Sequence, residues 1–108
     1  MEELTIEQLV IGHEQAFVPA KAVGVNTVVQ YRLTGEGGGD WIITIQDGKC
    51  QVSKGIAEKP KMTMTAEASV FRSVLLGKLD GTTAFMQGKL KISGDLNLAM
   101  RFPGFFTK

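Results

Sequence analysis

Residues 75–102 read "LLGKLDGTTAFMQGKLKISGDLNLAMRF", and the changes of hydrophobic pattern within this stretch decide the predicted fold. Asp80 and Gly88 bracket a short helical segment, since aspartate favours the N-cap of a helix and glycine favours its end. Residues 89–93 then alternate between polar and apolar side chains, as in a half-buried strand. Residues 94–102 return to a helical pattern. The stretch therefore predicts a helix, a strand and a helix in close succession.

The preceding chain predicts one more helix and four strands. Thr5 and Gln8 have the spacing of a capping box at the start of a helix over residues 5–17. Alternating segments follow at residues 26–35, 41–46, 49–55 and 61–65. Asp47-Gly48 is a typical hairpin turn between the second and third of them. Because the connections are short, we expect an antiparallel meander, followed by a helix within residues 67–79.

This order of elements predicts an α+β fold. We expect a mostly antiparallel sheet of about five strands, with helices covering one face. Along the first strand, Val29 and Tyr31 should point into the core, and Gln30 and Arg32 should point to solvent. A chain of 108 residues has the length of one domain, so residues 1–108 are expected to form a single unit.

Composition narrows the class of protein. The net charge is +1 and basic residues are scattered along the chain, which argues against a nucleic-acid partner. The one cysteine cannot form an internal disulfide and fits a reducing compartment. The acidic N-terminus is unlike a signal peptide, and no apolar run approaches the ~20 residues that span a bilayer. We therefore expect a cytoplasmic protein.

Candidate catalytic groups are few. His13 and Cys50 both lie on predicted apolar faces, without a partner at catalytic or metal-ligand spacing. The glycine-rich segment at residues 35–40 joins two strands, whereas a dinucleotide-binding loop leads from a strand into a helix. The two "GKL" triplets lack the serine or threonine of a phosphate-binding loop. The sequence therefore predicts no enzyme, no cofactor and no metal, although acyl-thioester chemistry at Cys50 or His13 remains an alternative.

The last predicted helix is apolar almost all round. Only Asn97 and Arg101 are polar in residues 96–102, so the helix must be buried on several sides or must face an apolar cavity. Nearby methionines suit a surface that adapts to ligands of varied shape, although they could equally fill the core. The tail that follows carries Phe105 and Phe106, and it is either a cap on the core or a movable lid.

The motifs of this region resemble those of the sterol carrier protein-2 (SCP-2) domain family. The shared series is "GKL", a short helix ending in "FM", "GKLKISGD" and a "LAM" helix. Upstream, residues 39–55, "GDWIITIQDGKCQVSKG", are similar to the tryptophan strand, hairpin and returning strand of that family. The resemblance covers roughly residues 28–102 in order and in register.

The resemblance implies a lipid-binding module without catalytic residues. It implies an apolar tunnel between the sheet and the helices, which takes fatty acids, acyl-coenzyme A esters, isoprenoids or sterol-like lipids with low selectivity. The chain ends in "FFTK" rather than in a peroxisomal signal, which favours acyl chains or isoprenoids in a prokaryote-like cytoplasm. An interaction module with the same fold and a filled core is the alternative.

The predicted partners are thus a lipid ligand and, transiently, a membrane that Phe105 and Phe106 would touch; the oligomeric state is left open. Arg101 is a candidate for holding a charged head group. The mechanism would be partition, since each buried methylene contributes about 0.8 kcal/mol. The residues expected to bind the lipid share an apolar character and a position in the last three elements: Phe85, Met86, Leu90, Ile92, Leu98, Met100, Phe102 and Phe105.

Overall fold

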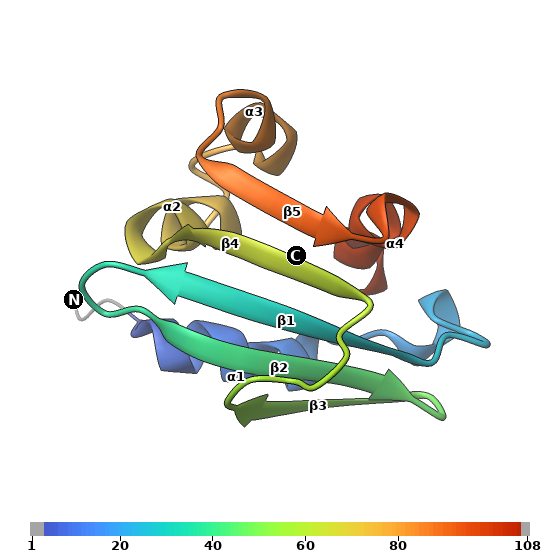
Figure 1. The fold of residues 1–108 in the computed structure, drawn as a ribbon. Helices are drawn as coiled ribbons and strands as arrows, with labels where there is room; N and C mark the ends of the chain where they lie inside the picture. Colours follow the sequence, from blue (N-terminus) through green and yellow to red (C-terminus); the bar gives the residue numbers. More distant parts are fainter. Residues whose placement is uncertain (1–3, 107–108) are drawn as a thin grey trace.

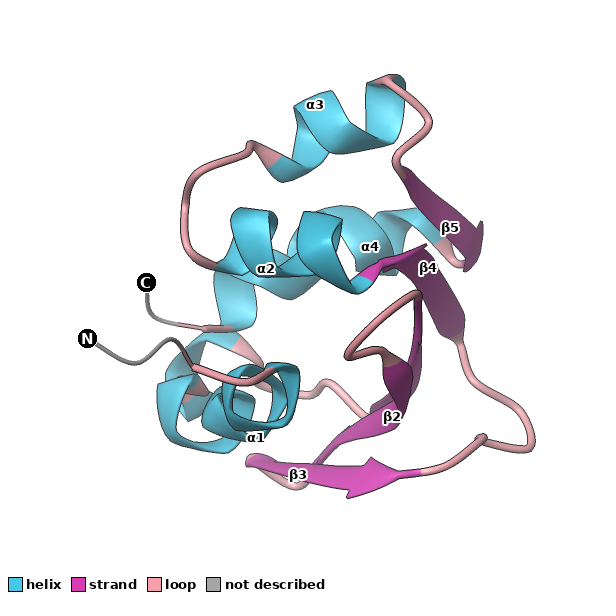
Figure 2. Ribbon diagram, turned by 90° about the vertical axis from the view of Figure 1, so that its left-hand side faces the viewer, coloured by secondary structure: helices cyan, strands magenta, loops and turns pink. Residues whose placement is uncertain are grey.

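The computed structural model describes residues 4–106, which form a five-stranded sheet with helices packed on one face (Figures 1 and 2). The elements in chain order are α1 (Ile6–Ala16), η1 (Pro19–Lys21), β1 (Thr27–Thr34), β2 (Gly39–Gln46), β3 (Lys49–Lys54), β4 (Met62–Glu67), α2 (Ala68–Leu75), α3 (Gly81–Met86), β5 (Leu90–Gly94), α4 (Leu96–Arg101) and η2 (Phe102–Phe105). The predicted α+β class is confirmed.

The strand order is β3-β2-β1-β4-β5. Strands β1, β2 and β3 form the expected antiparallel meander, and β4 pairs with β5 antiparallel. The prediction is wrong for β4, which lies parallel to β1 with Val29 opposite Met62. Beside β1, β4 lies inside the sheet, and its residues Met62 and Ala66 are buried. Pairing with the edge strand β3 would have buried less apolar surface, because β3 itself is mostly exposed.

The segment that joins β3 to β4 crosses the outer face of the sheet, and Gln30 anchors it there (Figure 2). The Nε2 atom of Gln30 donates to the carbonyl oxygens of Trp41 (3.1 Å) and Gly55 (2.9 Å), and its Oε1 atom accepts from the backbone N–H of Ala57 (2.6 Å). Only 1% of Gln30 is exposed. The expectation that it points to solvent is wrong because the crossing segment covers it.

Helices α1, α2 and α4 pack on the opposite face of the sheet (Figure 2). The core between the two layers is built from alternate residues of the strands and from single faces of the helices, as the hydrophobic patterns predict. Its members include Val10, Val29, Tyr31, Leu33, Trp41, Ile43, Ile45, Met62, Phe71 and Leu98. A smaller cluster around Ala84 lies beneath α3.

Side-chain caps fix where three of the helices begin. At α1, the Thr5 hydroxyl accepts from the backbone N–H of Gln8 (3.1 Å) and the Gln8 side chain accepts from that of Thr5 (2.8 Å), which is the predicted capping box. The Asp80 carboxylate caps α3 and the Asp95 carboxylate caps α4. Gly88 follows α3 with a φ of 77°, a left-handed conformation that favours glycine.

Candidate functional site

Aromatic side chains from β1, α2 and η2 meet between the sheet and the helices. The ring of Tyr31 lies edge to face against Phe71, with the ring centroids 5.1 Å apart, and against Phe102 at 6.2 Å. Phe102 in turn contacts Phe105 and Phe106. Segments up to about 70 residues apart in sequence therefore form one apolar interior, and no Asp, Glu, Lys or Arg among the described residues belongs to its core cluster.

Five of the eight predicted lipid-binding residues lie in this interior or at its edge. Leu98, Phe102 and Phe105 belong to the main core. Leu90 lies in the smaller cluster under α3, and the half-buried Ile92 packs against both clusters. These five residues therefore lie along β5, α4 and η2. Four of them are in or against the main core, and Leu90 belongs to the smaller cluster.

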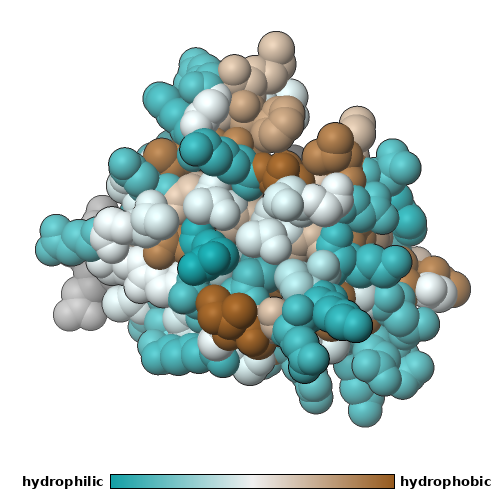
Figure 3. Space-filling model, in the orientation of Figure 1, coloured by the Kyte–Doolittle hydropathy of each residue, from teal (hydrophilic) through white to brown (hydrophobic). Residues whose placement is uncertain are grey.

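The other three predicted residues point outward. Met86 and Met100 are 80% and 83% exposed, and Phe85 is also exposed. Their placement on an inner wall is therefore wrong for this structure. Because α3 and α4 are six residues each, each helix buries a single face, and α4 uses that face for Leu98. Figure 3 shows apolar side chains at the end of the molecule formed by α3, the helix that carries Phe85 and Met86.

The predicted tunnel is not observed within residues 4–106, where side chains of the sheet and the helices pack against one another in one core cluster. The tail closes this interior: the backbone N–H of Val18 donates to the carbonyl oxygen of Phe105 (2.8 Å), and Phe106 forms a bridge with Phe17. The tail thus packs as a cap in this structure, and the prediction that Phe105 touches a membrane is wrong here, because that residue is 3% exposed. Arg101, the predicted head-group residue, stays exposed and lies over the ring of Phe105 at 5.6 Å.

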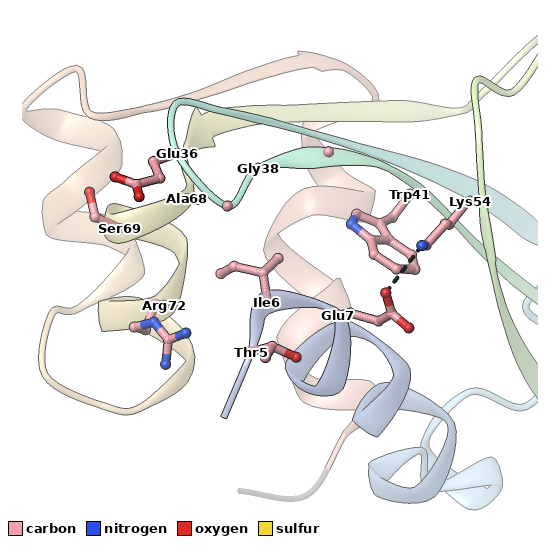
Figure 4. Close-up of a pocket in the computed structure, with 12 residues that line it drawn as sticks. Thr5, Ile6, Glu7, Glu36, Gly38, Trp41, Lys54, Ala68, Ser69 and Arg72 are labelled. Carbon is pink, nitrogen blue, oxygen red and sulfur yellow. Dashed lines mark ion pairs between the residues drawn. The ribbon is translucent and has the colours of Figure 1, made fainter. Parts of the chain in front are cut away.

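A pocket of about 560 Å³ lies at the other end of the interior, between α1, α2 and the turn that joins β1 to β2 (Figure 4). Its lining comes from four separate segments: Thr5, Ile6, Glu7, Glu36, Gly37, Gly38, Gly39, Trp41, Lys54, Ala68, Ser69 and Arg72. Sequence reasoning missed this pocket. The lone tryptophan of the chain, in strand β2, was a signal, but nothing local joined it to Arg72.

The pocket holds one ion pair and two unpaired donors. The Nζ atom of Lys54 lies 3.1 Å from the Oε1 atom of Glu7 and 5.2 Å from the centroid of the Trp41 ring. The Nε1 atom of Trp41 and the Nη1 atom of Arg72 are buried without a hydrogen-bond partner. Lys54 and Glu7 thus neutralise each other's charge, while the N–H groups of Trp41 and Arg72 remain free to donate a hydrogen bond.

His13 and Cys50 do not form a catalytic pair. The ring nitrogens of His13 contact the Leu9 carbonyl oxygen and the Tyr31 hydroxyl, and burial lowers its pKa. Burial, together with the charge of Glu14, raises the pKa of Cys50 to about 11, so the thiol stays protonated at neutral pH. Within the described chain, no cluster of His, Cys, Asp or Glu could hold a metal, and no helix is long and apolar enough to cross a membrane.

Comparisons with known proteins agree with this architecture. A solution structure of palmitated SCP2L2 from Aedes aegypti superposes with a TM-score of 0.75 at 26% identity, covering 94% of this chain and 91% of that one. The sec-alkylsulfatase Pisa1 from Pseudomonas sp. matches with a TM-score of 0.84 over 97% of this chain and 17% of its own, and its 23% identity shows a shared fold alone.

Sequence comparison extends the agreement. Hydroxysteroid dehydrogenase-like protein 2 of Xenopus tropicalis is 37% identical over 75 residues, which cover 68% of this chain but only 18% of that protein. A model of the SCP-2 sterol transfer family matches residues 10–107, almost the whole chain. The chain therefore belongs to the SCP-2 sterol transfer family.

Proposed function

We propose that this protein is a low-selectivity lipid carrier that holds the apolar chain of a fatty acid, an acyl-coenzyme A ester, an isoprenoid or a sterol-like lipid between its sheet and helices. The observation that carries the proposal is the interior formed by Tyr31, Phe71, Phe102 and Phe105, whose rings meet edge to face in a core cluster that holds no Asp, Glu, Lys or Arg among the described residues. Family membership supports the lipid class, and the palmitated Aedes aegypti relative supports an acyl chain.

Partition into this interior is the mechanism. A bound chain displaces edge-to-face ring contacts, each of which contributes about 0.5–1.5 kcal/mol. Each buried methylene returns about 0.8 kcal/mol, so a long acyl chain outweighs the few contacts that it breaks. The displaced elements are α4 and η2, which are only six and four residues long and are joined directly to each other. Leu90, Ile92, Leu98, Phe102 and Phe105 then line the bound chain.

The exposed apolar residues serve in a different step. Phe85 and Met86 on α3 and Met100 on α4 contact a membrane transiently while the lipid enters. In the stretch of chain that carries these residues, 78–101, the basic residues Lys78, Lys89, Lys91 and Arg101 outnumber the acidic residues Asp80 and Asp95. An anionic membrane surface attracts each such lysine by about 1 kcal/mol. The single cysteine further supports a reducing compartment such as the cytoplasm. Residues 1–108 act as one lipid-binding unit.

Native mass spectrometry of the purified protein, followed by organic extraction, tests the proposal. We expect co-purified lipid, and we expect added palmitate to displace a fluorescent fatty acid. A protein without lipid that displaces nothing would instead be an interaction module with a filled core. Hydrolysis of an acyl thioester by the wild type, lost in the His13→Gln/Cys50→Ala variant, would show the enzyme alternative to be correct.

A further inference from the structure

Two buried N–H groups without a hydrogen-bond partner belong to the same pocket. Trp41 is 5% exposed, and its Nε1 atom has no partner; the Nη1 atom of Arg72 is buried and has none either. In Figure 4 the indole nitrogen lies on the side of the ring that faces Gly38 and Ile6, and the guanidinium extends from α2 toward α1. Buried donors are rarely left unpaired in folded proteins, so each one needs an explanation.

Both unpaired groups are donors, which indicates an acceptor as the missing partner. Lys54 is already paired with Glu7, and no ion pair joins Arg72 to a carboxylate within residues 4–106. The eight-residue helix α2 also lines the pocket with residues of its first turn. The N-cap residue Glu67 makes no side-chain hydrogen bond to the backbone N–H groups of that turn. The N-terminal end of a helix favours negative charge. Glu36 also lines the pocket, and no ion pair joins its carboxylate to Arg72 within residues 4–106, so the two free donors and the helix end still fit an oxygen acceptor with a negative charge.

The floor of the pocket is continuous with the apolar core. Ile6, Trp41 and Ala68 line the pocket, and the same three residues belong to the main core cluster. A ligand with a polar end in the pocket would therefore have apolar side chains directly beyond it. Arg101, by contrast, lies over Phe105 and is not among the residues that line this pocket.

We propose that this pocket binds the carboxylate head group of a fatty acid, whose chain continues past Ile6 and Ala68 into the interior. Arg72 pairs with the carboxylate charge, and the indole N–H of Trp41 donates a hydrogen bond to one carboxylate oxygen. The inference rests on the proposed lipid-carrier function and adds to it a preference for free fatty acids over uncharged esters such as methyl palmitate.

Two variants test the two donors separately. Arg72→Met removes the guanidinium but keeps an unbranched apolar stem. Gly39→Ala places a methyl group over the indole nitrogen: a Cβ built at Gly39 lies 3.4 Å from the Nε1 atom of Trp41 and has no other close neighbour. Gly38 is unsuitable, because a Cβ there would clash with the carbonyl oxygen of Leu33. Arg32→Met is the matched control, since Arg32 pairs with Asp40 outside the pocket.

Palmitate, methyl palmitate and acetate are the ligands to compare, with the emission of Trp41, the only tryptophan, as the readout beside direct titration. We expect the wild type to prefer palmitate to its methyl ester and to ignore acetate. Arg72→Met should weaken palmitate binding by about tenfold or more, the usual effect of a lost charge-assisted hydrogen bond. Binding of methyl palmitate should be unchanged, and Gly39→Ala should reduce the same preference to a smaller extent.

Each contrary result has a distinct meaning. If the wild type binds palmitate and its ester equally and neither variant changes this, the head-group assignment is wrong while lipid binding stands. If neither ligand binds, the carrier function fails and the assignment fails with it. A response to acetate alone would make the pocket a small-anion site and would overturn the assignment. Should Arg72→Met not fold, Gly39→Ala decides the question.

Discussion

The Nε2 atom of His13 lies 3.0 Å from the hydroxyl oxygen of Tyr31, which links α1 to the central strand β1 inside the core. The other ring nitrogen, Nδ1, lies 3.1 Å from the Leu9 carbonyl oxygen, which can only accept. Nδ1 therefore carries the proton, and Nε2 accepts from the tyrosine hydroxyl. Burial lowers the pKa of His13 and raises that of Tyr31, so both groups are neutral in the folded protein.

The stability of the fold should depend on pH through His13. Because the pKa of His13 is lower in the folded than in the unfolded chain, the unfolded chain binds the extra proton first as the pH falls. The contribution of neutral His13 is therefore complete above its ordinary value of about 6.5 and is lost as the pH falls below it. Urea unfolding at pH 7.5 and pH 5 should show a steeper loss for the wild type than for His13→Gln. Parallel losses in the two proteins would contradict this role.

Gln30 should be the polar side chain whose loss costs the most stability. Gln30→Leu leaves the N–H of Ala57 and the carbonyl oxygens of Gly55 and Trp41 without their partner. One of these bonds is buried and two are part-buried, and a buried unpaired group costs about 1–3 kcal/mol, so we expect a loss of about 2–3 kcal/mol in the free energy of unfolding. Gln51→Leu, on exposed β3, is the matched control and should stay within about 0.5 kcal/mol. Equal effects of the two variants would show that the crossing segment does not depend on Gln30.

Much of the fold could be predicted because its signals are local. The capping pairs at Thr5 and Asp80, the alternation of Tyr31 and its neighbours, and the Asp47-Gly48 hairpin each depend on residues close in sequence. The partner of β4 could not be predicted in this way. Its pairing with β1 places Val29 beside Met62, although β2 and β3 lie between them in the sequence. The pairing depends on the apolar surface that the whole sheet buries.

The candidate site was less predictable for the same reason. Whether an apolar residue of a six-residue helix points inward depends on how that helix is docked, and the pattern alone placed Leu98 and Met100 on the same wall. The structure separates them, at 7% and 83% exposed. The pocket around Trp41 and Arg72 combines segments that start at residues 5, 36, 54 and 68, so it becomes visible only after the chain has folded.

Leu98 and Met100 should respond very differently to the same charge. Leu98→Lys buries an ammonium group in the core, and we expect the domain to lose more than about 4 kcal/mol or to fail to fold. Met100→Lys places the charge in water and should change the free energy of unfolding by less than about 0.5 kcal/mol. Thermal unfolding compares the two variants. If Met100→Lys stays folded but loses palmitate binding, Met100 contacts the bound chain and α4 must turn on loading.

Cys50 should react slowly with alkylating reagents. Because burial raises its pKa to about 11, the thiolate fraction at neutral pH is small, and alkylation by iodoacetamide should speed up about tenfold for each pH unit between 7 and 9. The same protein in denaturant is the control, since an ordinary thiol approaches a plateau near its pKa of about 8.5. Fast alkylation of the folded protein at pH 7 would reveal an activated thiol and would revive the acyl-thioester alternative.

The C-terminal tail provides the last prediction, because its two possible roles differ in their effect on stability. Phe105 is 3% exposed, contacts Phe102, and accepts a hydrogen bond at its carbonyl oxygen from the N–H of Val18. Truncation after Phe102 removes this ring and the bridge between Phe17 and Phe106. A fully buried phenylalanine contributes about 3–5 kcal/mol, so the truncated chain should melt at a much lower temperature.

Truncation after Phe106 keeps both phenylalanines, so it is the matched control for loss of the chain end and should leave the melting temperature unchanged. A lid predicts a different pair of results, in which truncation after Phe102 barely changes the melting temperature but alters the rate of palmitate exchange with vesicles. That outcome would overturn the cap. A large loss of stability confined to the shorter chain would show that any lipid entering beside α4 must first displace a tail that the folded protein requires.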